Sequence, residues 1–232
     1  MDLVAALDHL LVSTEQTLCR GRSPNVAALF AGTADRRLYE YFLTQTYHYV
    51  RRTNPLLSAA GDELARRVAD GRAGPLHARL GVRFQAHASE EEGHERWVLD
   101  DLAAIGSPEA IVEAIHPCRA VMAYLAYAAF AVRSAYPASF LGAAFILEGL
   151  SAALAGTTAR NLVAHSGIPG IENGVSFLAR HADADQGHME EARAVLAAIE
   201  EEAEKEAVFA CAAMSSQFYP HILQEFPAAA RA

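Results

Sequence analysis

The sequence of 232 residues has few cysteines, no cluster of basic residues and no long uninterrupted apolar run. The three cysteines, Cys19, Cys118 and Cys211, are odd in number and form no CxxC pattern, which predicts reduced thiols and excludes a disulfide framework. The net charge is −9, so the basic surface that nucleic-acid-binding proteins need is missing. The run Ala120 to Val132 is too short to cross a bilayer. We expect a protein that binds neither nucleic acid nor membranes.

The beginning of the chain has no basic segment followed by an apolar one, so we expect no export signal and a cytoplasmic location. Valine and isoleucine are sparse and never alternate with polar residues over the length of a strand, which argues against a β-sheet. The apolar fraction is 52%, with alanine prominent, and apolar residues recur at helical spacing between Gly and Pro breaks. No Pro/Ser-rich linker divides the chain. The sequence therefore predicts one all-α domain over residues 1–232, with about seven or more helices.

One short stretch carries three metal-binding side chains on a single helical face. His181, Asp185 and His188 stand at positions i, i+4 and i+7. At about 100° per residue, these offsets bring the side chains to within roughly 60° of one another over about two turns. The pattern predicts three ligands that project in one direction.

An earlier stretch repeats this spacing. His87, Glu91 and His94 have the same offsets, and we expect them on one long helix over residues 75–105. Two such helices could face each other and enclose one or two metal ions. Glu90, four residues before His94, is a candidate for supporting a ligand through a hydrogen bond without binding the metal itself.

Glu148 lies between the two motifs in a very apolar predicted helix, residues 138–165. A carboxylate in such surroundings is costly unless it is paired with a cation or bound to a metal. A salt bridge to Arg133 or Arg160 is one explanation, and metal ligation beside the two His-rich helices is the other. Imidazole and carboxylate ligands together suit Fe or Mn, with Zn also possible.

In these motifs the sequence resembles the heme-oxygenase-like diiron oxidases and oxygenases, which are relatives by fold of the TenA-type thiaminases and of heme oxygenase. His94, Glu148, His181, Asp185 and His188 match the family's ligands in order, and the last three match in exact spacing. The resemblance extends over about residues 35 to 200. It implies a heme-oxygenase-like helical bundle.

The resemblance further implies a non-haem centre of two irons per chain, which uses O₂ to oxidise a small molecule such as an amino acid, an amine or a fatty acid. It also implies a homodimer by analogy. Many members carry Glu seven residues before the first histidine, where this chain has His87. Glu91 is then the expected carboxylate of that segment, His87 ranks below the other ligands, and the number of metals stays open.

Aromatic residues are candidates for lining the substrate pocket. We assign Tyr47 and His48 from the aromatic segment 34–52, and Tyr124 and Tyr127 from the apolar segment that follows Cys118. Two alternatives to the di-iron enzyme remain. One is a thiaminase-like or cofactorless enzyme of the same fold, although thiaminases depend on a nucleophilic cysteine and none here has a convincing activating environment. The other is a non-catalytic helical binding protein with structural histidines.

Overall fold

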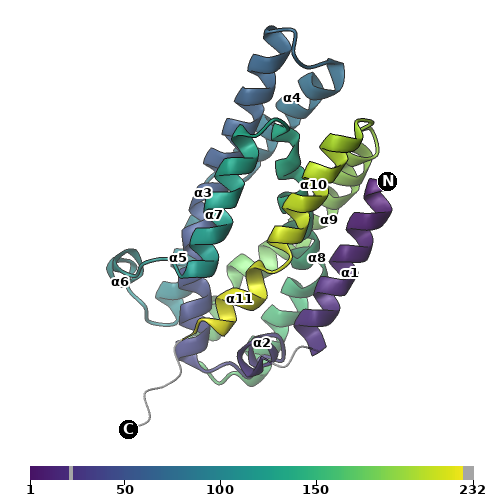
Figure 1. Cartoon of the computed structure of the whole chain (residues 1–232). Coiled ribbons are helices and arrows are strands. Elements are labelled where there is room, and N and C mark those ends of the chain that lie inside the picture. Colours follow the sequence, from purple (N-terminus) through teal and green to yellow (C-terminus); the bar gives the residue numbers. More distant parts are fainter. Residues whose placement is uncertain (21–22, 227–232) are drawn as a thin grey trace.

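A computed structural model describes residues 1–20 and 23–226, and within these residues the protein consists of helices, turns and loops without a strand (Figure 1). The helices are α1 (Leu3–Arg20), α2 (Pro24–Phe30), α3 (Arg36–Ala69), α4 (Pro75–Glu90), α5 (His94–Ala104), α6 (Glu109–Ala114), α7 (Arg119–Arg133), η1 (Pro137–Phe140), α8 (Leu141–His165), η2 (Ile171–Asn173), α9 (Ser176–Leu196), α10 (Glu202–Ser215) and α11 (Phe218–Gln224). The predicted all-α class is confirmed. That residues 1–232 form one domain stays a prediction.

The longest helix, α3, is fixed at its start by a side-chain cap and does not stop at its proline. The carboxylate of Asp35 accepts a hydrogen bond from the Leu38 backbone N–H at 2.8 Å, as N-cap residues do. The helix is continuous through Pro55, although proline removes one backbone hydrogen bond of a helix. The Asn54 side chain donates to the Ala88 carbonyl at 2.6 Å, which ties the middle of α3 to the end of α4.

The predicted helix over residues 75–105 is wrong as a single element. Helix α4 ends at Glu90, three residues form a turn, and α5 begins at His94. The reason is Gly93, whose φ of +83° lies in the left-handed region that an α-helix cannot contain. His87, Glu91 and His94 therefore come from the end of one helix, a turn and the start of another.

Helix α8 is the central apolar helix of the fold. It packs against α1, α9 and α10, while α3 packs against α4, α5 and α7 (Figure 1). The segment Pro137–His165 is long and apolar enough to cross a membrane, but 61% of its most apolar window is buried inside the protein. Such burial is that of a core helix. Gly142 allows α8 to approach α10 closely, because a Cβ atom there would collide with the carbonyl oxygen of Val208.

Candidate metal centre

The helix that carries the last motif is held at its start by a residue of another helix. Asp101 of α5 has no exposed surface, and its carboxylate accepts hydrogen bonds from the backbone N–H and the hydroxyl of Ser176, at 2.8 and 2.6 Å. It also accepts from the Phe177 N–H at 2.9 Å. These N–H groups are unpaired donors of the first turn of α9, so Asp101 caps that helix from outside. The interaction fixes α9 relative to α5, which begins with His94.

A first group of donors consists of Glu91, His94 and His181, whose nearest ligand atoms all lie within 4.8 Å of one another. All three residues are buried. His94 Nδ1 lies 3.1 Å from Glu91 Oε2. His181 donates from Nδ1 to the Phe177 carbonyl at 3.0 Å, so its Nε2 carries the free lone pair. The group unites the turn after α4, the start of α5 and helix α9.

A second group consists of Glu148 of α8 and Asp185 and His188 of α9, again within 4.8 Å. His188 Nδ1 lies 3.4 Å from Asp185 Oδ1 and 3.8 Å from Glu148 Oε2. On the other side of the ring, His188 Nε2 lies 3.3 Å from Glu90 Oε2. Glu90 is held by Arg83 at 3.0 Å. A carboxylate behind a ligating histidine fixes its tautomer and orientation, which is the role expected for Glu90.

His87 lies between the two groups. Its Nε2 atom is 3.3 Å from Glu148 Oε1 and 3.7 Å from Glu91 Oε1. It also belongs to a third group of possible ligands with Glu90 and His188. The ion-pair contacts found for Glu148 are with His87 and His188, and neither Arg133 nor Arg160, the partners considered from the sequence, is among them.

The charges of this centre fit a bound cation. Burial raises the pKa of Glu148 well above its usual range, and the nearby Asp185 and Glu91 carboxylates raise it further. Burial also raises the pKa of Glu91, but the His87 imidazole 3.7 Å away and the hydrogen bond from His94 outweigh it, and the net shift is downward. His87 Nε2 and His188 Nδ1 are buried without a hydrogen-bond partner. Imidazole nitrogens without a partner that face two buried carboxylates and the half-buried Glu148 form a donor set that a divalent transition metal satisfies.

Comparison with known families agrees with this chemistry. Residues 40–219 match the sequence family described as "Iron-containing redox enzyme". The chain belongs to this family. A search of curated proteins gave no match.

Solved structures show the fold of this iron-containing redox enzyme. A domain of unknown function with a heme oxygenase-like fold from Shewanella denitrificans is 21% identical, with a TM-score of 0.81 over 97% of this chain and 92% of that one. A TenA homologue from P. horikoshii is 12% identical, with a TM-score of 0.70 over 97% and 98%. A TenA homologue from Pseudomonas syringae is 12% identical, with a TM-score of 0.73 over 95% and 90%. The predicted heme-oxygenase-like fold is confirmed.

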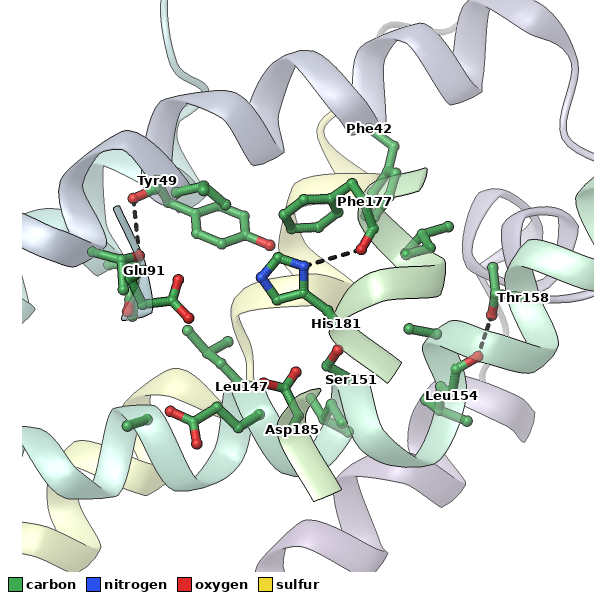
Figure 2. A pocket seen from close by; sticks show the side chains of 18 of the residues that line it. Phe42, Tyr49, Glu91, Leu147, Ser151, Leu154, Thr158, Phe177, His181 and Asp185 are labelled. Atoms are coloured by element: carbon green, nitrogen blue, oxygen red, sulfur yellow. Dashed lines mark hydrogen bonds between the residues drawn. The ribbon is translucent and has the colours of Figure 1, made fainter. Parts of the chain in front are cut away.

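An apolar cavity adjoins the candidate donor groups of this iron-containing redox enzyme, and one of the four aromatic residues predicted for the substrate pocket lies on it. Tyr124 lines it, but Tyr47, His48 and Tyr127 are not among its lining residues. His48 lies instead beside the backbone of Ile115, and burial lowers its pKa. The cavity is lined by residues from seven α-helices (α1, α2, α3, α4, α7, α8 and α9). Its lining includes donors of both groups, and Figure 2 labels Tyr49, Glu91, Leu147, Ser151, Leu154, Thr158, Phe177, His181 and Asp185 among the lining residues.

Three residues that support the candidate ligands were not predicted from the sequence. Asp101 caps α9, and Arg83 joins Glu90 to Glu191 of α9, with 2.7 Å between Arg83 Nε and Glu191 Oε2. Trp97 stacks on the imidazole of His94, with ring centroids 3.9 Å apart. Only Trp97 had a detectable pattern, since it follows His94 by three residues and so lies on the same helical face.

Proposed function

We propose that the protein is a non-haem iron oxidase or oxygenase that holds two irons, uses O₂ and oxidises a small molecule. The observation that carries this proposal is the pair of donor groups, Glu91/His94/His181 and Glu148/Asp185/His188, together with the family match. The first group offers two imidazoles and one carboxylate, and the second offers one imidazole and two carboxylates. Helical bundles build carboxylate-bridged di-iron centres from such sets. Mn and Zn are alternatives that the same donors could bind.

The protein's own residues would hold and shield the centre. His181 is oriented by the Phe177 carbonyl, and His188 by Glu90 and Arg83. Glu148 of α8 and Asp185 of α9 would hold the second metal between these two helices, and the cavity beside the donors has a mostly apolar lining. Two ferrous ions at such a centre supply the electrons and open coordination positions for reducing O₂.

The cysteines favour this proposal over a thiaminase-like enzyme. Thiaminase chemistry needs a thiolate nucleophile in the pocket. Of the described residues that line the cavity, none is a cysteine. Cys19 is exposed on α1, and burial raises the pKa of Cys211 to about 12, which keeps that thiol protonated at neutral pH.

The test is an anaerobic titration with Fe(II), followed by elemental analysis after desalting and then by measurement of O₂ consumption. About two irons per chain and rapid O₂ uptake are expected, because each donor group holds one metal. Glu148→Ala and His188→Ala should each reduce the content to about one iron, since both remove a donor from the second group.

A matched control removes a histidine from a helix surface far from the donors. His9 is exposed on α1, so His9→Ala should retain the full iron content. Full occupancy in Glu148→Ala and His188→Ala alike would contradict the assignment. Failure of the iron-loaded protein to consume O₂ with any substrate would favour the non-catalytic binding protein. The homodimer and the cytoplasmic location stay predictions.

A further inference from the structure

Helix α7 is apolar on every side, although one of its faces lies on the surface. Between Arg119 and Arg133 it has no charged residue. A helix of this composition is normally buried all round. One side of α7 does pack on α3, α10 and α11, and Figure 1 shows the helix on the outside of the bundle, next to α3. On its outer face Met122 is 50% exposed and Phe130 is 65% exposed. Large apolar side chains that share one exposed face mark an interaction surface.

This outer face has the same kinds of side chain in both directions from its middle residue, Ala126. At about 100° per residue, seven residues of α7 project within roughly 60° on either side of Ala126. In chain order they are Arg119, Met122, Ala123, Ala126, Ala129, Phe130 and Arg133. The order is basic, large, small, small, small, large and basic. An interface between two copies related by a two-fold axis must be self-complementary, and a face with this symmetric order meets that condition.

Two copies of α7 that cross at Ala126 and run in opposite directions give each large side chain a suitable partner. The small Ala126 at the crossing allows the two helix axes to approach to about 8 Å. Met122 of each copy then faces Phe130 of the other, because the two residues lie equally far from Ala126. A thioether beside an aromatic ring is a favourable contact, and the arrangement contains it twice. If the copies ran in the same direction, each residue would face its own equivalent.

The two ends of this face are complementary in charge. Glu225 lies at the start of α7, where its carboxylate accepts hydrogen bonds from the backbone N–H groups of Arg119 and Ala120 at 3.0 and 3.1 Å. It also pairs with the Arg119 side chain at 3.5 Å. At the other end, Arg133 donates only within its own helix, to the Ala129 carbonyl at 3.5 Å, and none of the ion pairs among residues 1–20 and 23–226 includes it. In the antiparallel pair Arg133 comes to the end of the other copy where Glu225 lies, and a carboxylate can accept from two cations.

We propose that the outer face of α7 binds the same face of a second copy of this chain, antiparallel about Ala126. The inner side of α7 carries Tyr124, which lines the cavity beside the donors, so the second copy covers the outside of a cavity wall. A lipid surface fits less well, because the net charge of −9 opposes binding to anionic membranes and a lipid surface does not require a symmetric order of side chains. The contact involves none of the metal donors and is independent of the proposed function.

The experiment is sedimentation equilibrium of the full-length, metal-free protein from about 1 to about 100 µM, the range expected for a small interface. The protein should form dimers, and Phe130→Glu should raise the Kd at least about 100-fold, because a carboxylate then loses its hydration against an apolar face. Ala126→Glu should do the same, since two carboxylates then meet at the crossing. Val82→Glu changes an apolar residue of α4 that is 72% exposed, and it should leave the Kd unchanged. A monomer over the whole range, or one Kd for all three variants, would overturn the inference.

An equimolar mixture of Met122→Lys and Phe130→Glu tests the orientation. In the antiparallel pair the introduced lysine faces the introduced glutamate, so the mixture should associate at least about ten-fold more tightly than either variant alone. No gain in the mixture would overturn the antiparallel arrangement. Binding of a monomeric protein to vesicles of phosphatidylcholine and phosphatidylglycerol, lost in Phe130→Glu, would overturn the second copy in favour of a lipid surface. Both variants should keep their helix content and the iron content of the unmodified protein, because both positions are exposed, and a loss of iron on dissociation would contradict the independence of the two sites.

Discussion

At the scale of single residues, His87 is the side chain whose role depends most on the metal. It is 7% exposed, it faces Glu148 and Glu91, and its Nε2 has no hydrogen-bond partner. A buried imidazole nitrogen in that position is either a ligand or an unsatisfied polar atom that costs about 1–3 kcal/mol. Because its Nε2 lies near Glu148, we expect His87 to bind the same metal as Glu148, Asp185 and His188. The second group would then have two imidazoles, like the first.

The variant His87→Ala distinguishes these cases. If His87 is a ligand, one of the two metals should bind about 10- to 100-fold more weakly while the other is retained, because ligand or ligand-support changes cost that much in metal affinity. Equilibrium dialysis against Mn(II), with elemental analysis, measures this. If His87 is only an unsatisfied neighbour, both metals should remain and the metal-free protein should become no less stable.

The spacing in the sequence indicates which side chains lie together in the candidate donor groups, but it does not indicate which residues support them. His181, Asp185 and His188 keep one face because α9 is regular through them, so period alone locates them. Asp101 caps α9 from 75 residues earlier, and no local pattern can reveal a contact between helices of that separation. Of the four aromatic residues assigned to the substrate pocket, Tyr124 lines the cavity, and the assignment of the others stays a prediction. Tyr47 and His48 are buried like Tyr49, but the side of α3 on which they lie is decided by packing.

At the scale of elements, the crossing of α8 and α10 depends on Gly142. Ala is favoured over Gly inside a helix by about 1 kcal/mol, but a Cβ at this position would overlap the Val208 carbonyl, which is backbone and cannot move alone. The clash should outweigh the helix preference for Ala. Gly142→Ala should therefore destabilise the protein by about 1–3 kcal/mol in urea unfolding.

Gly187 of α9 provides the matched control. It is also helical, and a Cβ built there meets nothing within 4 Å. Gly187→Ala should therefore stabilise the fold by up to about 1 kcal/mol. Equal effects of the two substitutions would show that the α8–α10 contact is looser than the structure indicates.

The turn between α4 and α5 shows where helix prediction from periodicity stops. The offsets of His87, Glu91 and His94 are those of a helix; Glu91 and His94 do meet in one donor group, and His87 lies between the two groups. Yet the chain leaves the helix at Glu91, because Gly93 adopts a left-handed conformation. Pro55 is the opposite case, since a strong breaker is accommodated inside α3. At Gly93 a local conformational preference ends the helix that the spacing predicts, whereas at Pro55 the surrounding packing overrides the local preference.

At the scale of the whole molecule, acid stability should depend on a charge cluster far from the metal centre. Glu63 of α3 accepts hydrogen bonds from Arg66 and Arg67, which lower its pKa from 4.5 to about 2. Arg67 also donates to the carbonyls of Ser134 and Ala135, so the cluster joins α3 to the end of α7.

A carboxylate whose pKa is lower in the folded than in the unfolded protein stabilises the fold at pH values above the unfolded-state pKa. This stabilisation is lost as the pH falls toward the folded-state pKa. Glu63→Gln should thus cost up to about 1 kcal/mol at pH 7, since the pair is partly exposed. The difference from the unmodified protein should narrow below about pH 4.5 and vanish toward pH 2. Urea unfolding of both proteins at several pH values measures the gap. Glu206→Gln on α10 removes an exposed carboxylate without touching these arginines, and a similar pH profile for that variant would contradict the explanation.

The stacking of Trp97 on His94 has an optical consequence. The chain has a single tryptophan, and its ring also meets the edge of His181 at 5.5 Å and lies under the Arg180 guanidinium at 4.8 Å. All tryptophan fluorescence of the protein therefore comes from a side chain beside two of the imidazoles that would hold the first metal. The molecule carries its own fluorescent reporter, so the filling and emptying of the centre can be followed in the unlabelled protein in real time.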